Sequence, residues 1–296
     1  MIREKLTGVG VAMITPFTSD GRVDYQALAR MIDYVIEGGV DYIVALGTTA
    51  ETPTLSQEER KSVVRCVKEV NGGRLPIILG AGGNCTADVV SYLRTGDFDG
   101  IDAILSVTPY YNKPSQEGIY QHFKAVAEAS PCSVVLYNVP GRTGVNMSPA
   151  TVLRLVHDCP KIIAIKEAGG SLPQAANILK GCPADFAVVS GDDNLTLPMV
   201  ALGGSGVISV AANVFPEKFC KMVHLALEGR FAEAAPLHLS MMETVDALFA
   251  EGNPSGVKAA LSCCGLIENR LRLPLVPVSE QLRNRIGMLL KSNDLR

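Results

Sequence analysis

The sequence lacks the features of a membrane protein and of a nucleic-acid-binding protein. No apolar run reaches the roughly 18 residues that a membrane-spanning helix needs. The 27 lysines and arginines stand against 30 aspartates and glutamates, and the net charge of −3 provides no basic surface for nucleic acid. The opening residues, MIREKLTGVG, lack the apolar core of a secretory signal, so we expect a cytoplasmic protein.

Patterns typical of disulfide frameworks and metal sites are also missing. The 8 cysteines are scattered without a C-x-x-C pair, which favours reduced and mostly buried thiols. The 4 histidines are isolated, and each lies in a segment with a helical pattern, which argues against a metal site at strand ends. We therefore expect no metal ligands in this chain.

What the sequence does contain is a regular alternation of short apolar runs and longer stretches of helical period. This alternation is typical of βα units around a parallel sheet, and continuous Val, Ile and Leu content suits strands buried on both faces. Eight such runs within about the first 230 residues fit the roughly 250-residue size of a (β/α)8 barrel. The runs are 8–16, 41–47, 75–82, 102–111, 133–140, 161–168, 186–193 and 206–214.

A doubly wound open sheet is the alternative architecture. It would require a G-x-G-x-x-G turn after a strand, and the nearest candidate, residues 80–85, has Cys85 in place of the third glycine. The sequence therefore predicts an α/β protein with a (β/α)8 TIM barrel over residues 1–230. Residues 231–296 have a helical pattern and are predicted to form an appended C-terminal helical segment.

Several of the predicted helices have recognisable starts. Asp24 is placed to cap the first turn of the helix that follows it. Ser56 and Glu59 form a complete capping box, and Ser148 stands before Pro149, a residue favoured at the first helical position.

Lys166 is an unexpected residue, because it ends the apolar run IIAIKEA (162–168). The two-residue period of a strand places Ile162, Ala164 and Lys166 on one face and the isoleucines between them on the other. If the lysine faces the poorly solvated barrel interior, burial favours its neutral amine, the form that attacks a carbonyl. The alternative, a lysine at the strand mouth paired with a carboxylate such as Glu167, remains open.

Other polar residues close the predicted strands, at the end of a barrel where active sites lie. Tyr137 ends the run before that of Lys166, and its phenol is suited to pass protons. Thr48 and Thr49 offer hydroxyl and backbone N–H groups that suit a small carboxylate. Arg142 lies in a loop and can bind a carboxylate in bidentate fashion. Taken singly, each has an ordinary explanation as a turn, packing or solvated loop residue, and only their convergence favours a site.

Together these motifs resemble the dihydrodipicolinate synthase family of the pyruvate-dependent class I aldolases. The resemblance runs from about Gly8 to the C-terminal helices, with the motifs in order. The residues that carry it are Gly47-Thr48-Thr49-x-Glu51, Tyr110-Tyr111-Asn112, Tyr137-Asn138-Val139-Pro140-Gly141-Arg142-Thr143 and Ile165-Lys166-Glu167.

The resemblance implies that Lys166 forms a Schiff base with pyruvate and that the derived enamine attacks L-aspartate 4-semialdehyde, on the route to diaminopimelate and lysine. It further implies that Tyr137 donates and accepts protons and that Thr49 links it to Tyr111 of an adjacent subunit. Arg142 would bind the carboxylate of the semialdehyde.

The resemblance also implies how pyruvate is held and what else the protein needs. Thr48, Thr49 and the backbone near Ile208 would surround pyruvate, with Gly191 and Asp192 nearby. No cofactor is expected, because the imine acts as the electron sink. The partners expected are the two substrates and further copies of the chain, in a dimer or a tetramer built from two dimers, with no nucleic acid and no membrane.

Two positions depart from the family pattern. Ala50 stands where the family has glycine after the two threonines, so a positive φ there would be strained, and we expect a small local change. Asn84, Asp88 and Tyr110 match the site at which some members bind lysine as a feedback inhibitor. Gln57 and Arg60, however, stand where histidines are common in sensitive bacterial enzymes. The charge of Arg60 would repel the ammonium groups of lysine, which predicts weak or absent inhibition.

Two alternative functions remain. A related sugar-acid lyase, such as N-acetylneuraminate lyase, would share the lysine and the tyrosine, but a hydroxylated sugar chain would not call for a guanidinium at Arg142. A catalytically inactive binding barrel would usually have lost at least one member of the set. The members of that set are Lys166, Tyr137, Thr49, Tyr111 and Arg142.

Overall fold

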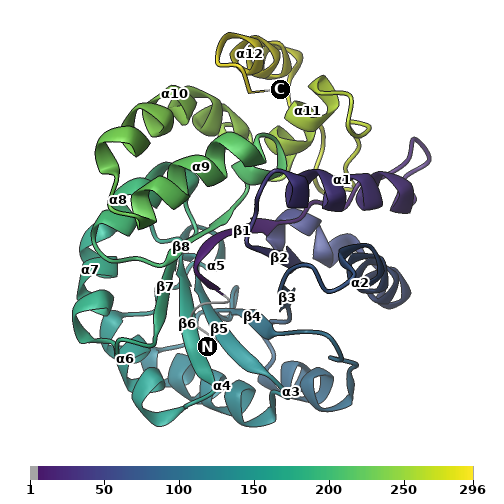
Figure 1. Ribbon diagram of the computed structural model, residues 1–296. Helices are drawn as coiled ribbons and strands as arrows, with labels where there is room; N and C mark the ends of the chain where they lie inside the picture. Colours follow the sequence, from purple (N-terminus) through teal and green to yellow (C-terminus); the bar gives the residue numbers. More distant parts are fainter. Residues whose placement is uncertain (1–5, 296) are drawn as a thin grey trace.

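The computed structural model describes residues 6–295 and forms a closed barrel of eight parallel strands inside a ring of helices (Figure 1). Each strand pairs with the next along the chain, and β8 pairs with β1, which confirms the predicted TIM barrel. The strands are β1 (Gly8–Ala12), β2 (Tyr42–Ala45), β3 (Ile77–Gly80), β4 (Ala103–Val107), β5 (Ser133–Asn138), β6 (Ile162–Glu167), β7 (Ala187–Ser190) and β8 (Gly206–Ser209).

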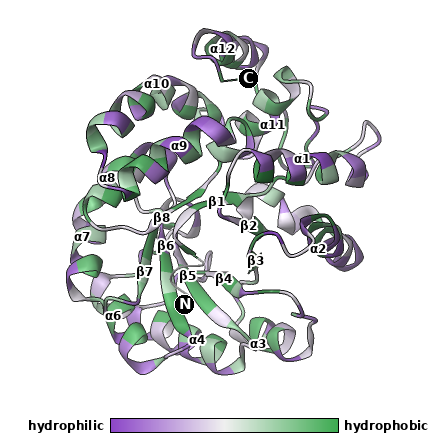
Figure 2. Ribbon diagram, in the orientation of Figure 1, coloured by the Kyte–Doolittle hydropathy of each residue, from purple (hydrophilic) through white to green (hydrophobic). Residues whose placement is uncertain are grey.

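The helices cover the outer face of the barrel and carry both polar and apolar residues, whereas the strands are mainly apolar (Figure 2). Several start as predicted: Asp24 accepts a hydrogen bond from the Ala27 backbone N–H, and Ser56 and Glu59 form the capping box. The helices are α1 (Tyr25–Glu37), α2 (Gln57–Asn71), α3 (Thr86–Thr95), α4 (Gln116–Ala129), α5 (Pro140–Thr143), α6 (Pro149–Asp158), α7 (Leu172–Gly181), α8 (Thr196–Ala201), α9 (Pro216–Leu227), α10 (Phe231–Phe249), α11 (Ser255–Cys263) and α12 (Glu280–Ser292).

Several strands end earlier than the apolar runs predicted. The run 8–16 continues four residues beyond the end of β1 at Ala12, and the run 206–214 continues beyond Ser209 into a 3₁₀ turn, Ala211–Asn213. Residues of both extensions, such as Met13 and Val214, are fully or almost fully buried in the core between the barrel and the helices. A run of apolar residues indicates that a segment is buried, and at these two ends the chain stays buried after the strand has ended.

A register shift in β6 overturns part of the predicted face assignment. Val134 pairs with Ile162 and Val135 with Ala164, so β6 advances two residues where β5 advances one. Ala164 therefore faces the barrel interior, whereas Ile162 joins the cluster between barrel and helices. The prediction that Ile162 shares the face of Ala164 and Lys166 is wrong, because period two does not hold across the shift.

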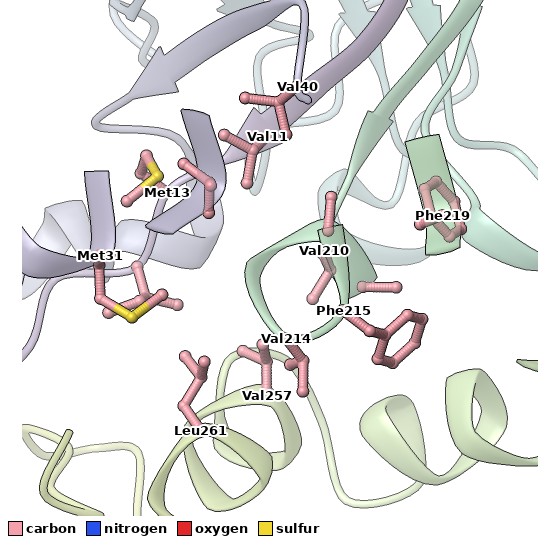
Figure 3. Packing of buried hydrophobic residues seen from close by; sticks show 14 of the residues in the cluster. Val11, Met13, Met31, Val40, Val210, Val214, Phe215, Phe219, Val257 and Leu261 are labelled. Atoms are coloured by element: carbon pink, nitrogen blue, oxygen red, sulfur yellow. The ribbon is translucent and has the colours of Figure 1, made fainter. Parts of the chain in front are cut away.

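The C-terminal helices share a core with the barrel. One buried cluster contains Met31 of α1, Val214 after β8, and Val257 and Leu261 of α11, and Figure 3 shows these side chains packed around one another. The predicted boundary between barrel and C-terminal segment, at residue 230, falls between α9 and α10. The shared cluster contains residues from both sides of this boundary, so the division into two parts stays a prediction.

No helix within residues 6–295 is long and apolar enough to cross a membrane. The first five residues, on which the expectation of no secretory signal partly rests, lie outside the described part of the chain.

A histidine–aspartate pair lies near the beginning of β1 and β2. His224 Nε2 and Asp41 Oδ2 are 2.8 Å apart, and the same carboxylate oxygen accepts a hydrogen bond of 2.6 Å from the Val9 backbone N–H. The hydrogen bond with Asp41 raises the pKa of His224 above its ordinary value, against the opposing effect of partial burial.

This pair predicts a pH-dependent contribution to stability. Because the folded-state pKa is raised, the contribution is fully present below the unfolded value of about 6.5 and is lost as pH rises through the folded-state pKa. We expect the fall in thermal unfolding midpoint between pH 6 and pH 8.5 to be smaller in His224→Gln than in the wild type. The difference should correspond to less than about 1 kcal/mol, because both side chains are partly exposed.

His157→Gln is the control for this measurement, since it removes a more exposed histidine–aspartate contact. Circular dichroism melts of the three proteins provide the comparison. An unchanged pH dependence in His224→Gln would show that the pair contributes nothing.

Candidate active site

Lys166 and Tyr137 face one another at the carboxyl end of the barrel. They are register partners on β6 and β5, and their exposed fractions are 6% and 7%. Lys166 Nζ lies 4.5 Å from the centroid of the Tyr137 ring. In the part of the chain that the structure describes, neither the ammonium group nor the phenol hydroxyl is hydrogen-bonded to a protein group. Both polar groups therefore remain available to a substrate.

Gly191 makes room for the lysine side chain. A Cβ atom at this position would lie 3.0 Å from Lys166 Cε and 2.5 Å from the Cβ of Ala168. These distances are shorter than ordinary contacts between carbon atoms. The glycine predicted to lie near the substrate thus lies against the lysine itself.

Glu167 lies on the opposite face of β6 and is not the ion-pair partner of Lys166. Its carboxylate accepts hydrogen bonds from Asn138 Nδ2 at 3.1 Å, Gln174 Nε2 at 3.0 Å and the Gly169 backbone N–H at 2.8 Å. Burial raises the pKa of Glu167, and these hydrogen bonds oppose that effect. Because Asn138 and Glu167 are register partners directly after Tyr137 and Lys166, this network holds the ends of both strands in place.

The two threonines lie in a short 3₁₀ turn, Thr48–Ala50, which begins three residues after the end of β2 at Ala45. The Thr49 side chain is buried and that of Thr48 is half-buried. The strain considered at Ala50 does not arise, because the positive φ falls one residue later, at Glu51, where it is 54°. The Ala50 carbonyl accepts a hydrogen bond of 2.8 Å from the Thr15 hydroxyl, and Ala50 fits the turn without a positive φ.

Glu51 anchors this turn through a fully buried ion pair with Lys258 of α11. Its carboxylate also accepts a hydrogen bond of 3.0 Å from the Arg272 backbone N–H. Lys258 Nζ donates to the Arg270 carbonyl at 2.9 Å and lies 4.0 Å from the centroid of the Phe17 ring. Burial lowers the pKa of Lys258 to about 8, although the Glu51 carboxylate acts in the other direction.

Arg142 and Thr49 are connected through a residue that the sequence analysis did not select. Arg142 lies in α5 at the surface, and its Nη2 donates to the Asn253 carbonyl at 3.3 Å. Asn253 Nδ2 donates to Thr49 Oγ1 at 2.9 Å. The only sequence signal was the position of Asn253 before Pro254, in a break between two helical stretches.

The end of β8 is fixed by a buried carboxylate. Asp193 Oδ2 accepts hydrogen bonds from the backbone N–H groups of Val210 at 3.1 Å and Ala211 at 2.9 Å. Burial raises the pKa of Asp193 to about 6. Ile208 lies fully buried two residues earlier, in the interior cluster that also contains Tyr137. The backbone near Ile208 therefore reaches the same rim as the lysine.

The remaining predicted residues lie away from this group. The Tyr111 side chain is 87% exposed with a φ of 73°, and it makes no hydrogen bond within residues 6–295. Tyr110 is 40% exposed, Asn84 is half-buried, and Asp88 is exposed in the first turn of α3. Asn112 links this region to the loop after β3 through a hydrogen bond of 3.0 Å from Nδ2 to the Asn84 carbonyl.

The described residues contain no group of three His, Cys, Asp or Glu side chains arranged to hold a metal ion. The chemically distinctive group is a buried amine at the carboxyl end of a barrel strand, next to a phenol. Fold and site together define a lysine-dependent aldolase-type (β/α)8 barrel.

Comparison with known proteins narrows this class to one family. The model of the dihydrodipicolinate synthetase family matches residues 5–293, and the chain belongs to that family. A 4-hydroxy-tetrahydrodipicolinate synthase of Flavobacterium psychrophilum is 56% identical over 284 residues, which are 96% of this chain and 97% of that protein. The resemblance predicted from the motifs is thereby confirmed.

Solved structures agree in fold over the whole chain. Dihydrodipicolinate synthase from Acinetobacter baumannii, described as chloride-inhibited and complexed with pyruvate, has a TM-score of 0.95 and 41% identity, with 98% of this chain and 99% of that chain covered. The enzyme from Cyanidioschyzon merolae, described with lysine bound, has a TM-score of 0.95 and 38% identity, with 99% and 100% covered.

The buried Glu51–Lys258 pair predicts a large stability effect. Lys258→Met should lower the free energy of unfolding by about 3–5 kcal/mol, because it leaves the Glu51 carboxylate buried without a cation. Urea unfolding followed by circular dichroism measures the loss. Lys61→Met is the matched control, because it removes an ion pair whose side chains are largely exposed, and it should cost less than about 1 kcal/mol. Equal losses in the two variants would contradict this reading of the buried pair.

Proposed function

We propose that this protein is a lyase that condenses pyruvate with L-aspartate 4-semialdehyde to give 4-hydroxy-tetrahydrodipicolinate, in the synthesis of diaminopimelate and lysine. The observation that carries the proposal is the buried Lys166 amine facing the Tyr137 phenol at the carboxyl end of the barrel. The names of its relatives support the same reaction, since those at 46–56% identity are 4-hydroxy-tetrahydrodipicolinate synthases.

The first half of the reaction activates pyruvate. The neutral amine of Lys166 attacks the keto carbon, and the carbinolamine loses water to give an imine. The imine withdraws electrons from the neighbouring methyl carbon, which loses a proton to form an enamine. Tyr137 carries the protons that these steps release and take up, because its phenol lies beside the amine.

The second half joins the two substrates. The enamine carbon attacks the aldehyde carbon of the semialdehyde, and the resulting alkoxide takes a proton. The amino group of the same substrate then attacks the imine carbon, closes the ring and releases Lys166 as a free amine. Arg142 holds the semialdehyde carboxylate as the two reacting carbons approach.

Pyruvate is held by the groups that surround the lysine. Thr48 and Thr49 provide hydroxyl groups for its carboxylate, together with the backbone near Ile208. Gly191 lies against the lysine stem and keeps space beside it. In this proposal Thr49 also links Tyr137 to Tyr111.

A second copy of the chain completes that link. Tyr111 is 87% exposed on its own subunit and lacks a hydrogen bond within the described residues, which suits a side chain that reaches into a neighbouring subunit. We therefore infer a homo-oligomer, either a dimer or a tetramer built from two dimers. A cytoplasmic location is part of the same proposal.

The alternative functions find less support. A sugar-acid lyase such as N-acetylneuraminate lyase would share the lysine and the tyrosine, but Arg142, held near the Thr49 turn through Asn253, suits a short substrate with a carboxylate. An inactive binding barrel is disfavoured because the amine, the phenol and the arginine are all present at one end of the barrel.

Borohydride reduction in the presence of pyruvate tests the proposal. We expect mass spectrometry of the wild-type chain to find a pyruvate-derived adduct on Lys166, and Lys166→Ala to give none. Lys161→Ala is the matched control, because Lys161 directly precedes β6 at the opposite end of the barrel, and it should still be trapped. A coupled assay should show turnover with aspartate semialdehyde and none with N-acetylneuraminate, and a wild-type chain without an adduct would refute the imine mechanism.

We further propose that Asn84, Asp88 and Tyr110 line a site related to the one that binds lysine in other members. Arg60 in α2 adds a cation, which opposes binding of an effector with two ammonium groups. We predict little or no inhibition by micromolar lysine in steady-state assays, and greater sensitivity in Arg60→His. Lys61→Met, a neighbouring exposed cation on the same helix, serves as the control. Strong inhibition of the wild type would contradict the role given to Arg60.

A further inference from the structure

Asn253 occupies a position between two residues of the proposed site. It lies in the turn between α10 and α11, is 7% exposed, and belongs to the C-terminal segment, not to the barrel strands. Its side-chain Nδ2 donates to Thr49 Oγ1 at 2.9 Å, and its backbone carbonyl accepts from Arg142 Nη2 at 3.3 Å. One residue from outside the barrel thus contacts both the threonine turn and the arginine.

The hydrogen bond to Thr49 has a fixed direction. An amide NH2 group only donates, so it makes Thr49 Oγ1 an acceptor at that contact. A hydroxyl group carries a single proton, and that proton is consequently free to be donated elsewhere. In the proposed reaction, the neighbours of Thr49 in the proton path are Tyr137 and Tyr111. Asn253 therefore selects the orientation in which Thr49 donates toward a phenol oxygen.

The backbone around Asn253 is held firmly enough to keep this geometry. Ser255 Oγ donates to the Val276 carbonyl at 2.9 Å, and Lys258, one helical turn further along, is ion-paired with Glu51. Glu51 directly follows the Thr48–Ala50 turn, so the same helix that positions Asn253 also anchors the threonines. Both partners of the Asn253–Thr49 hydrogen bond are therefore fixed relative to one another.

The amide oxygen of Asn253 indicates that this residue is not optimised for stability alone. Within the described residues Oδ1 is buried and has no hydrogen-bond partner. A buried acceptor without a donor is unfavourable, and such atoms are few in native structures. An apolar side chain would avoid the unpaired oxygen but would lose the donor to Thr49.

We propose that Asn253 is a positioning residue of the condensation reaction: its NH2 group directs the Thr49 hydroxyl proton toward the proton path, and its carbonyl holds Arg142 at the barrel mouth. This inference rests on the proposed function, in which Thr49 relays protons to the phenols.

The test compares Asn253→Asp with Asn253→Ala. Aspartate has the shape of asparagine but replaces the donor with an acceptor, so it captures the Thr49 proton, whereas alanine leaves that proton free to rotate. We expect kcat to fall by at least about tenfold in Asn253→Asp and by less in Asn253→Ala. Because a buried aspartate carboxylate also costs stability, the order of the two losses does not by itself exclude a structural role, and the double-mutant cycle below supplies that distinction.

A double-mutant cycle with Thr49→Val separates an effect on the hydroxyl from an effect on the fold. Once the hydroxyl is gone, Asn253→Asp has no proton to redirect, and its further effect on kcat should lie within about twofold. An equal loss in both backgrounds would overturn the proposal. Should Asn253→Asp show no cooperative melt, Asn253→Ala completes the same cycle, with its smaller loss expected to disappear in Thr49→Val.

Asn293→Asp is the matched control, because Asn293 Nδ2 donates to Thr244 Oγ1 at 3.3 Å in another part of the C-terminal segment. It should leave kcat within about twofold of the wild type. Trapping with pyruvate and borohydride distinguishes a failure of the proposed function from a failure of the role given to Asn253. An untrapped wild type would refute the proposed function and this inference with it. A trapped and active wild type whose kcat survives in Asn253→Asp would refute the role of Asn253 alone.

Discussion

Closure of the barrel between β1 and β8 is the constraint on which the rest of the structure depends. Once eight parallel strands close on themselves, their carboxyl ends must meet at one rim, whatever their separation along the chain. Lys166 and Tyr137 come together because neighbouring strands carry them in register. The Thr48–Ala50 turn and the segment after β8 reach the same rim for the same reason. The positions of the strands thus determine which groups can act together.

A second constraint comes from outside the barrel. The Glu51 backbone has a positive φ, which a side chain other than glycine adopts only when its surroundings impose it. Here the surroundings are a buried ion pair with Lys258 and a hydrogen bond from the Arg272 backbone N–H. Since Glu51 follows the threonines directly, the C-terminal segment determines the shape of a loop that belongs to the second strand. The barrel supplies the rim, and the C-terminal helices shape part of it.

Sequence patterns predicted what depends on local periodicity and missed what depends on long-range contact. Eight apolar runs located the eight strands, and Lys166 stood out because a cation at the end of an apolar run needs an explanation. Ile162 was assigned to the wrong face, since a register shift against β5 cannot be read from β6 alone. Asn253 carried no signal beyond its proline neighbour, because its partner Thr49 lies 204 positions away. Glu51 was visible as part of a motif, but its buried partner Lys258 was not.

The long separation of these contacts has a consequence for the order in which the protein is made. Thr49 and Asn253 are 204 positions apart, so a ribosome working at about 5–20 residues per second adds the second roughly 10 to 40 s after the first. During that interval the nascent chain contains Thr48 and Thr49 but neither Asn253 nor Lys258, the two residues that hold the threonine turn in place. Synthesis therefore completes the rim only after all eight strands of the barrel have been made.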